Sequence, residues 1–241
     1  LTKFEDYYEE GKPYLDEIYW HVIPDAASRA VAYETGVVDI LPGGSVENFD
    51  VQRIADMENT CITDKGWEYF GPLSWMWLNN REGPTADKRF RQAVMYAMDR
   101  DFARDALWNG LGKVAKGPVS SSTRFFTDDV TTYDHDPEKA KALLEEMGYD
   151  GETVRLLPLP YGETWQRWAE AVKQNLGEVG INVEIVSTDV AGWNQKLAEW
   201  DYDMAFTYLY QYGDPALGVA RTYISTNIAK GSQWNNVEGY E

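Results

Sequence analysis

Residues 153–186, TVRLLPLPYGETWQRWAEAVKQNLGEVGINVEIV, decide the fold class of this chain. The apolar runs at 153–157 and 181–186 have the length and composition of strands. Between them, residues 164–178 place apolar side chains on one helical face, and Gly180 follows as a helix-ending glycine. The side chains of that face are Trp165, Trp168, Ala169, Val172 and Leu176. This stretch therefore predicts a strand, a helix and a second strand.

The pattern continues toward the C-terminus with one more helix and one more strand. A short helix is predicted through Trp193, Leu197 and Trp200. Residues 201–212 then alternate with period two, which indicates a partly buried strand. Its alternating side chains are Tyr202, Met204, Phe206, Tyr208, Tyr210 and Tyr212. Because crossovers between parallel strands are right-handed and cover the sheet, the order β-α-β-α-β predicts an α/β sandwich with helices on both faces.

Two helices are predicted ahead of this unit. The first begins at Asp87 or Thr85 and has an apolar face at helical spacing. That face consists of Phe90, Ala93, Val94, Ala97 and Met98. The second spans 136–148, with Asp-Pro at its start and Gly at its end. The break at residues 81–84, REGP, predicts a domain boundary.

Shorter elements are predicted in the N-terminal third. Strands are predicted at residues 18–22, 37–41, 61–69 and 75–78. Asp25 and Gly36 are suited to begin and end a helix between the first two strands, and residues 49–57 form a short amphipathic segment.

The composition excludes several classes of function. With 40 acidic and 22 basic residues the net charge is -18, which repels phosphate backbones and excludes nucleic acid as an expected partner. Cys61 is the single cysteine, and His21 and His135 lie far apart, so neither an intrachain disulfide nor a Cys/His zinc site is expected. There is no apolar run of about 18 residues and no signal-peptide pattern at the start. Because the chain begins without Met, we expect a fragment of a longer protein.

Enzyme motifs do not occur: the sequence contains no phosphate-binding glycine loop ending in Lys and Ser or Thr, no HExxH and no GxSxG. Neighbouring acids such as those at 128–129 and 145–146 are typical of solvated faces. We therefore predict no catalytic residue, no metal site and no cofactor.

The end of the last predicted strand is the candidate ligand site, because open α/β sheets bind ligands beyond the carboxyl ends of their strands. Residues 208–215, YLYQYGDP, combine aromatic rings with an amide at Gln211 and a carboxylate at Asp214. The same residues also fit a core strand followed by an ordinary Gly-Asp-Pro turn. The pattern alone does not decide between these two interpretations.

Several stretches together resemble the peptide/nickel-type solute-binding proteins of ATP-driven importers, known as extracellular solute-binding family 5. Residues 77–79, WLN, and 87–100, DKRFRQAVMYAMDR, are similar to the family's N followed by DxRxRQAxxYAIDR. Residues 133–148, YDHDPEKAKALLEEMG, are similar to its YxxDPxKAKxLLxExG. Residues 33–40 are similar to its GEVD segment, and residues 232–240 resemble its return toward a first lobe.

The resemblance implies a fold and a division of the chain. The implied fold is α/β, periplasmic-binding-protein-like of type II, cluster C, with two lobes whose mixed sheets are flanked by helices. Residues 1–83 would then be a central segment of lobe I with the hinge strand. Residues 84–241 would be most of lobe II without its last helices.

The resemblance also implies a function. Such a protein captures an oligopeptide or a similar small polar solute in the periplasm and delivers it to the permease subunits of an ABC importer, as a monomer without cofactor or catalysis. Two alternatives remain. Abundant Trp, Tyr, Asp and Glu are also typical of a carboxylate-dependent glycan hydrolase. The same scaffold also suits a peptide sensor or a chaperone outside transport.

One position departs from the pattern of the family. In members that bind free peptide N-termini, an Asp four residues before the proline of the strand-end motif pairs with the ligand's ammonium group. Here that position is Gln211, and an amide cannot neutralise an ammonium in a desolvated cleft. We expect either that Asp214 substitutes or that the solute is blocked, neutral or sugar-like. The expected solute contacts are Tyr208, Tyr210, Gln211, Asp214 and Trp75.

Overall fold

The computed structural model describes residues 1–224 and 227 of the chain. The chain divides into two compact units, Leu1–Met57 and Glu58–Glu241, which are treated separately below. The predicted lobe boundary at 83–84 concerns the complete protein and stays a prediction. The segment 232–240, which resembles a return toward a first lobe, lies outside the described residues.

The first unit contains two short helices. Helix α1, Ala26–Glu34, begins where the sequence predicts, because the Asp25 carboxylate accepts a hydrogen bond from the Ser28 N–H at 2.7 Å. Helix α2, Asn48–Ala55, confirms the predicted amphipathic segment. The buried hydrophobic residues of this unit are Ala30, Ala32 and Ile54. Its described part therefore has a small core.

Three predicted strands are wrong for this structure. Residues 18–22 and 37–41 have no regular structure, and residues 61–69 form an irregular segment that runs into the one-turn helix α3, Trp67–Phe70. A strand is stable only when its backbone groups are paired with a neighbour. Among the described residues of the first unit, the one β-bridge joins Thr2 to Glu17. Next to this bridge Ile18 exchanges two main-chain hydrogen bonds with Leu1, but among the described residues none of the three apolar runs belongs to a strand ladder, and they stay irregular.

The second unit is built on a four-stranded mixed sheet in the order β1-β4-β2-β3. Its strands are β1 (Leu73–Leu78), β2 (Val154–Leu157), β3 (Val183–Ile185) and β4 (Met204–Leu209). Strand β1 pairs antiparallel with β4, whereas β2 pairs parallel with both β3 and β4. The carboxyl ends of β2, β3 and β4 therefore meet at one edge, together with the amino end of β1.

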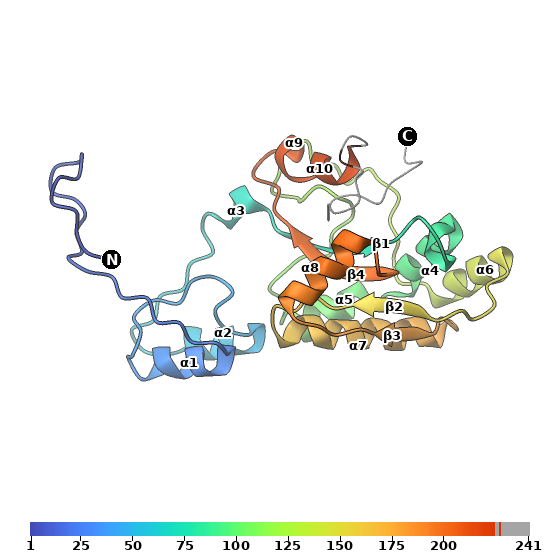
Figure 1. Ribbon diagram of the computed structural model, residues 1–241, viewed down its shortest axis with the longest axis horizontal. Coiled ribbons are helices and arrows are strands. Elements are labelled where there is room, and N and C mark those ends of the chain that lie inside the picture. The colour runs from blue at the N-terminus through green and yellow to red at the C-terminus, as the bar shows by residue number, and fades with distance from the viewer. Residues whose placement is uncertain (225–226, 228–241) are drawn as a thin grey trace. The chain divides into compact units, whose positions relative to one another are not determined.

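The two crossover helices follow the predicted order. Helix α7, Glu163–Glu178, connects β2 to β3, and helix α8, Val190–Glu199, connects β3 back past β2 to β4 (Figure 1). The two connections run in opposite directions along the sheet. With right-handed crossovers they lie on opposite faces, in agreement with the predicted sandwich.

The core of the second unit includes the interface between the sheet and α7. The ring of Trp168 on α7 stacks on Phe206 of β4 with centroids 4.1 Å apart, and Trp108 meets Trp168 edge-on at 5.0 Å. Of the predicted apolar face of α7, Trp168, Ala169, Val172 and Leu176 are buried and Trp165 is partly buried. This packing fixes the carboxyl end of β4 against α7.

The remaining elements of the second unit are short or pack beside the sheet. They are η1 (Pro84–Ala86), α4 (Lys88–Ala97), α5 (Arg100–Phe102), the π-helix η2 (Ala103–Leu107), α6 (Pro137–Met147), α9 (Pro215–Gly218) and α10 (Ala220–Tyr223). Helices α4 and α6 pack on each other. The predicted caps are confirmed, since Asp87 accepts from the Arg89 N–H at 2.7 Å and Asp136 from the Lys139 N–H at 3.0 Å.

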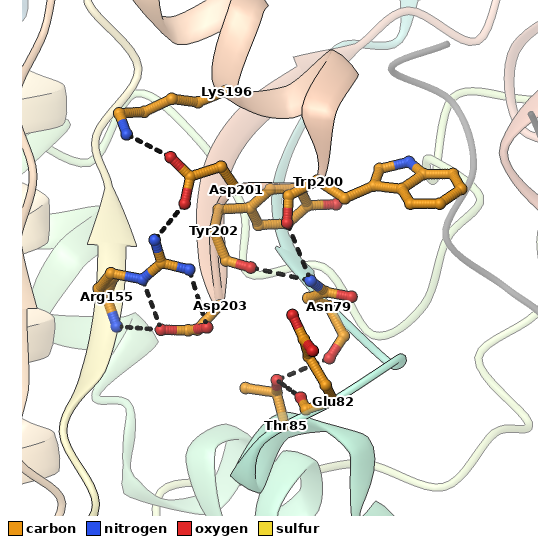
Figure 2. A network of polar contacts seen from close by, with 9 residues as sticks. All are labelled: Asn79, Glu82, Thr85, Arg155, Lys196, Trp200, Asp201, Tyr202 and Asp203. Carbon is orange, nitrogen blue, oxygen red and sulfur yellow. Dashed lines mark hydrogen bonds and ion pairs between the residues drawn. The ribbon is translucent and has the colours of Figure 1, made fainter. Parts of the chain in front are cut away.

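A polar network ties the amino ends of β2 and β4 together (Figure 2). The backbone N–H of Arg155 on β2 donates to Asp203 at 2.7 Å, and its guanidinium binds both Asp203 and Asp201. Lys196 of α8 reaches the other oxygen of Asp201 at 2.6 Å. Lys196 first and Arg155 second hold the pKa of Asp201 below its usual range. The network therefore anchors the sheet at the edge opposite to the candidate ligand site.

Candidate functional site at the carboxyl edge of the sheet

Aromatic rings from three segments meet at the carboxyl edge. Tyr208 and Tyr210 come from the end of β4, with ring centroids 5.3 Å apart. The ring of Phe70, which precedes the antiparallel β1, has its centroid 5.4 Å from that of Tyr210. The ring of Tyr161, which follows β2, has its centroid 6.2 Å from that of Tyr208. We call these rings, with Trp67 and Tyr212 beside Tyr210, the aromatic surface. They come together because β1 runs opposite to β2 and β4.

The aromatic surface is accessible at its margins and half-buried at its centre. Tyr161 is 52% exposed and Phe70 40% exposed, whereas Tyr208 and Tyr210 are half-buried. Burial, and after it the neighbouring Tyr210, raises the pKa of the Tyr208 hydroxyl. Half-buried rings that carry hydroxyl groups suit a ligand with one apolar face and several polar groups.

The sequence predicted Tyr208 and Tyr210 at this edge but missed Trp67, Phe70 and Tyr161. Tyr161 follows the carboxyl end of β2 and could have been found by the same rule of strand ends. Trp67 was assigned to a strand at 61–69 and Phe70 to no element, and only the antiparallel entry of β1 brings them to this edge.

The strand end at Gln211 is held by the loop before β1. The Gln211 N–H donates to the Phe70 carbonyl oxygen at 2.6 Å. On the other side Gly218 of α9 approaches so closely that a β-carbon there would lie 2.4 Å from Gln211 Cα. The side chain of Gln211 is 0% exposed, and neither its amide oxygen nor its amide nitrogen has a hydrogen-bond partner among the described residues. Gln211 is therefore a buried amide without internal partners.

The two other predicted contacts, Asp214 and Trp75, are not among the residues of the aromatic surface. The Asp214 carboxylate accepts from the Ala216 N–H at 2.9 Å and so caps α9. Trp75 is paired in register with Thr207 on β4, whereas Tyr208 is paired with Ser74. Because successive side chains of a strand point to opposite faces, Trp75 and Tyr208 lie on different faces of the sheet. The structure thus joins Tyr208 and Tyr210 and places Trp75 elsewhere, and the set of solute contacts stays a prediction.

A further segment reaches this edge that sequence reasoning did not single out. Gly71 is buried with φ +49°, and a β-carbon there would lie 3.1 Å from Thr123 Oγ1 and 3.2 Å from atoms of Ser120 and Ser122. Thr123 is buried, and its hydroxyl has no partner among the described residues. A glycine at 71 therefore lets residues 120–123 approach the loop that holds Gln211. The composition of 120–123, SSST, gave no signal for this contact.

Two acids in segments beside this edge have structural partners. Asp214 caps α9, and Glu163 at the start of α7 pairs with Arg167 at 2.6 Å. Within residues 1–224 and 227, no cluster of His, Cys, Asp and Glu is arranged to hold a metal ion. In the same described part of the chain, no helix combines the length and apolarity that crossing a bilayer requires.

Comparison with known proteins places this chain in a family. The family model for bacterial extracellular solute-binding proteins, family 5 Middle, matches residues 1–230. The dipeptide-binding protein of Escherichia coli K12 is 26% identical over 236 residues, which are 95% of this chain and 43% of that protein. This chain therefore spans less than half the length of that relative.

Solved structures agree with this match. The binding protein AgaA from A. tumefaciens R10, in complex with agropinic acid, has a TM-score of 0.75 and 32% identity, covering 88% of this chain and 42% of its own. The DppA protein of Helicobacter pylori, in complex with the peptide STSA, has a TM-score of 0.82 and 20% identity, covering 96% and 44%. Such neighbours confirm the predicted α/β fold of the type II periplasmic binding proteins. The chain belongs to the bacterial extracellular solute-binding proteins of family 5.

Proposed function

We propose that this chain is part of an extracytoplasmic solute-binding protein, which captures an oligopeptide or a similar small polar solute and delivers it to the permease subunits of an ABC importer. The observation that carries the proposal is the aromatic surface at the carboxyl edge of the sheet, where Phe70, Tyr161, Tyr208 and Tyr210 converge. Family membership supports it. In this proposal the protein acts in the periplasm as a monomer, without catalysis or a cofactor.

Binding would follow from closure of two lobes around the solute. Residues 1–83 would contribute to the first lobe and 84–241 to the second, and contacts made by both lobes would favour the closed state. The contacts proposed in this chain are Tyr208, Tyr210, Gln211, Asp214 and Trp75. The rings supply stacking surface, and the amide of Gln211 supplies a donor and an acceptor.

Two classes of solute are candidates for this site. A free peptide N-terminus needs an anionic partner, and Asp214 is the carboxylate three residues after Gln211, although it already caps α9. A non-peptide solute suits the neutral Gln211. The complex of AgaA with agropinic acid, in a relative 32% identical to this chain, supports considering such a solute.

Native mass spectrometry of the complete protein, purified from its own host compartment, tests the proposal. A ladder of peptide masses supports an oligopeptide importer, with Asp214 as the partner of the ammonium group. A single mass of a sugar derivative or an opine supports a non-peptide importer. A protein that carries no solute, and binds none when peptides and opines are added, contradicts the proposal. Turnover of a chromogenic glycoside would favour the hydrolase alternative.

Gln211→Ala in the complete protein tests the assigned contact. We expect weaker solute binding and a nearly unchanged melting temperature, because the change removes a buried amide that has no internal partner. Gln174→Ala, at an exposed position of α7, is the matched control and leaves both quantities unchanged. If Gln211→Ala binds the solute with unaltered affinity, Gln211 is not a solute contact.

A further inference from the structure

The chain leaves β4 through two successive residues with a left-handed backbone. Tyr212 has a φ of +52° and Gly213 a φ of +71°. Glycine adopts this conformation freely, whereas the β-carbon of a tyrosine is crowded there, so a bulky residue with such a φ is uncommon. The backbone at Tyr212 is therefore strained, and contacts elsewhere in the fold have to hold it in place.

The ring of Tyr212 is held among three other rings. Its centroid lies 5.8 Å from that of Tyr210, 6.2 Å from that of Phe70 and 6.4 Å from that of Tyr69. All three pairs meet edge-on, which is an arrangement that the charge distribution of aromatic rings favours. These ring contacts offset the strain at Tyr212.

Tyr69 contacts this turn from outside the aromatic surface. Its side chain is 58% exposed, and its ring contacts among the described residues are those with Phe70, at 5.5 Å, and with Tyr212. The ring also lies beside the backbone of Gly213, where a β-carbon would be 3.4 Å from Tyr69 Cδ2 and 3.6 Å from Cε2. One exposed ring therefore packs on both left-handed residues that follow β4.

Helix α3, which carries Tyr69, and the end of β4 stabilise each other. The helix has a single turn and none of its residues is buried, so it has little stability of its own. It is joined to the strand end through the Phe70 carbonyl oxygen, which accepts from the N–H of Gln211 at 2.6 Å and from that of Tyr212 at 3.4 Å. Loss of the Tyr69 ring would therefore loosen the strand end together with α3.

Tyr210 connects this turn with the proposed solute site. It belongs to the aromatic surface, its ring contacts that of Tyr212, and the hydrogen bond of the next residue, Gln211, to Phe70 fixes the backbone at this point. When only a fraction of the molecules holds a binding site in the right conformation, the apparent affinity of that site falls by the same fraction. Contacts that hold the turn therefore act on the affinity for the solute.

We propose that Tyr69 is a positioning residue for solute binding. Through Tyr212 and Gly213 it holds the end of β4 in the conformation in which Tyr210 presents its ring to the solute, and Tyr69 does not touch the solute itself. The ring makes these contacts, so the hydroxyl group is not needed. This inference rests on the proposed function and deepens it by adding a residue outside the predicted set of solute contacts.

Amide hydrogen exchange of the solute-free complete protein tests the positioning role directly. We expect the Gln211 N–H, which is bonded to Phe70, to exchange about tenfold faster in Tyr69→Ala and at the wild-type rate in Tyr69→Phe. The melting temperature should stay nearly unchanged, because no residue of α3 is buried. Phe102→Ala, which removes a ring of similar exposure (50%) from α5, is the matched control and keeps the wild-type rate. An unchanged rate in Tyr69→Ala overturns the inference.

Binding kinetics of the complete protein test the consequence for the solute. The probes are agropinic acid, which the relative AgaA binds, and the tripeptide Ala-Ala-Ala, and the variants are compared with each probe that the wild type binds. Because the strand end must first adopt its place, Tyr69→Ala should lower the association rate constant about tenfold and leave the dissociation rate constant nearly unchanged. Tyr69→Phe and Phe102→Ala are expected to bind as the wild type does.

The contrary outcomes separate this inference from the proposed function. Unaltered binding in Tyr69→Ala, or faster dissociation at an unchanged association rate, overturns the inference and leaves a solute-binding protein. Equal weakening in Tyr69→Phe and Tyr69→Ala overturns it as well, because the hydroxyl group would then make the contact. A wild type that binds neither probe is tested with its copurified solute, and if it carries none, the proposed function is contradicted and this inference with it.

Discussion

The side-chain Nδ2 of Asn79 donates a hydrogen bond to the carbonyl oxygen of Tyr202 at 3.0 Å, which joins two segments 123 residues apart. The same nitrogen donates to the Trp200 carbonyl oxygen at 3.2 Å (Figure 2). The amide oxygen accepts from the Arg81 N–H at 3.2 Å. Thr85 in turn donates to the Asn79 carbonyl oxygen at 2.6 Å. One buried amide therefore connects the end of β1 with the turn before β4.

Asn79→Ala should lower the free energy of unfolding by about 2–4 kcal/mol, because it leaves two carbonyl oxygens and one N–H without their partner in a buried place. Urea denaturation of the complete protein measures the change. Asn182→Ala is the matched control, since its exposed amide makes a hydrogen bond to the Gly151 carbonyl oxygen at 2.8 Å. We expect a loss of at most about 1 kcal/mol for the control. Equal losses in the two variants would contradict the special role of Asn79.

The pair of Asp201 with Lys196 and Arg155 predicts a dependence of stability on pH. The pKa of Asp201 is lower in the folded chain than in the unfolded one, mainly because of Lys196. The stability that the ionised Asp201 contributes to folding is therefore complete above the ordinary carboxyl pKa of about 4. It is lost as the pH falls through the lower pKa of the folded state. The melting temperature of the wild type should fall more steeply below pH 4 than that of Asp201→Asn. A control, Asp129→Asn, changes an exposed residue and should keep the wild-type slope. Parallel curves for wild type and Asp201→Asn would show that the pair adds no measurable stability.

Gly218 should not tolerate a side chain. A β-carbon there would lie 2.4 Å from Gln211 Cα and from the Tyr210 carbonyl oxygen, so α9 would have to move away from the strand end. Gly218→Ala should therefore cost about 1–3 kcal/mol of stability and weaken solute binding, because it displaces Gln211. At Gly117, by contrast, a β-carbon meets nothing within 4 Å. Gly117→Ala is thus expected to be close to neutral in both measurements, and an equally mild Gly218→Ala would argue against close packing of α9.

The elements that the sequence predicted correctly are those that local interactions define. Helices α4 and α6 begin at Asp87 and Asp136, whose carboxylates accept from N–H groups two or three residues later. The order of strands and helices from 153 to 212 followed from the same kind of local periodicity. Such signals are contained in short windows of sequence.

The predictions that were wrong or missing concern segments whose structure depends on distant partners. The apolar runs at 18–22 and 37–41 resemble strands, but in the described part of the chain neither belongs to a strand ladder, and the pairing of the first run is limited to the exchange of two main-chain hydrogen bonds between Ile18 and Leu1. Phe70 and Thr123 reach the candidate site through contacts with Gln211 and Gly71, and such close approaches between distant segments leave no local pattern. The chemistry of Gln211 was visible in the sequence, whereas its burial without a partner was not.

Tyr210 should be the ring on which solute binding depends most. Its ring centre lies within 6.3 Å of those of Trp67, Phe70, Tyr208 and Tyr212, so it is the centre of the aromatic surface. Tyr210→Leu removes the stacking face, and we expect the affinity of the complete protein for its copurified solute to fall about tenfold, in line with about 1 kcal/mol for one aromatic contact and a further loss of area. Tyr210→Phe keeps the ring and should retain most of the affinity. If Phe weakens binding as much as Leu does, the hydroxyl rather than the ring makes the contact, and the aromatic surface is not a stacking site.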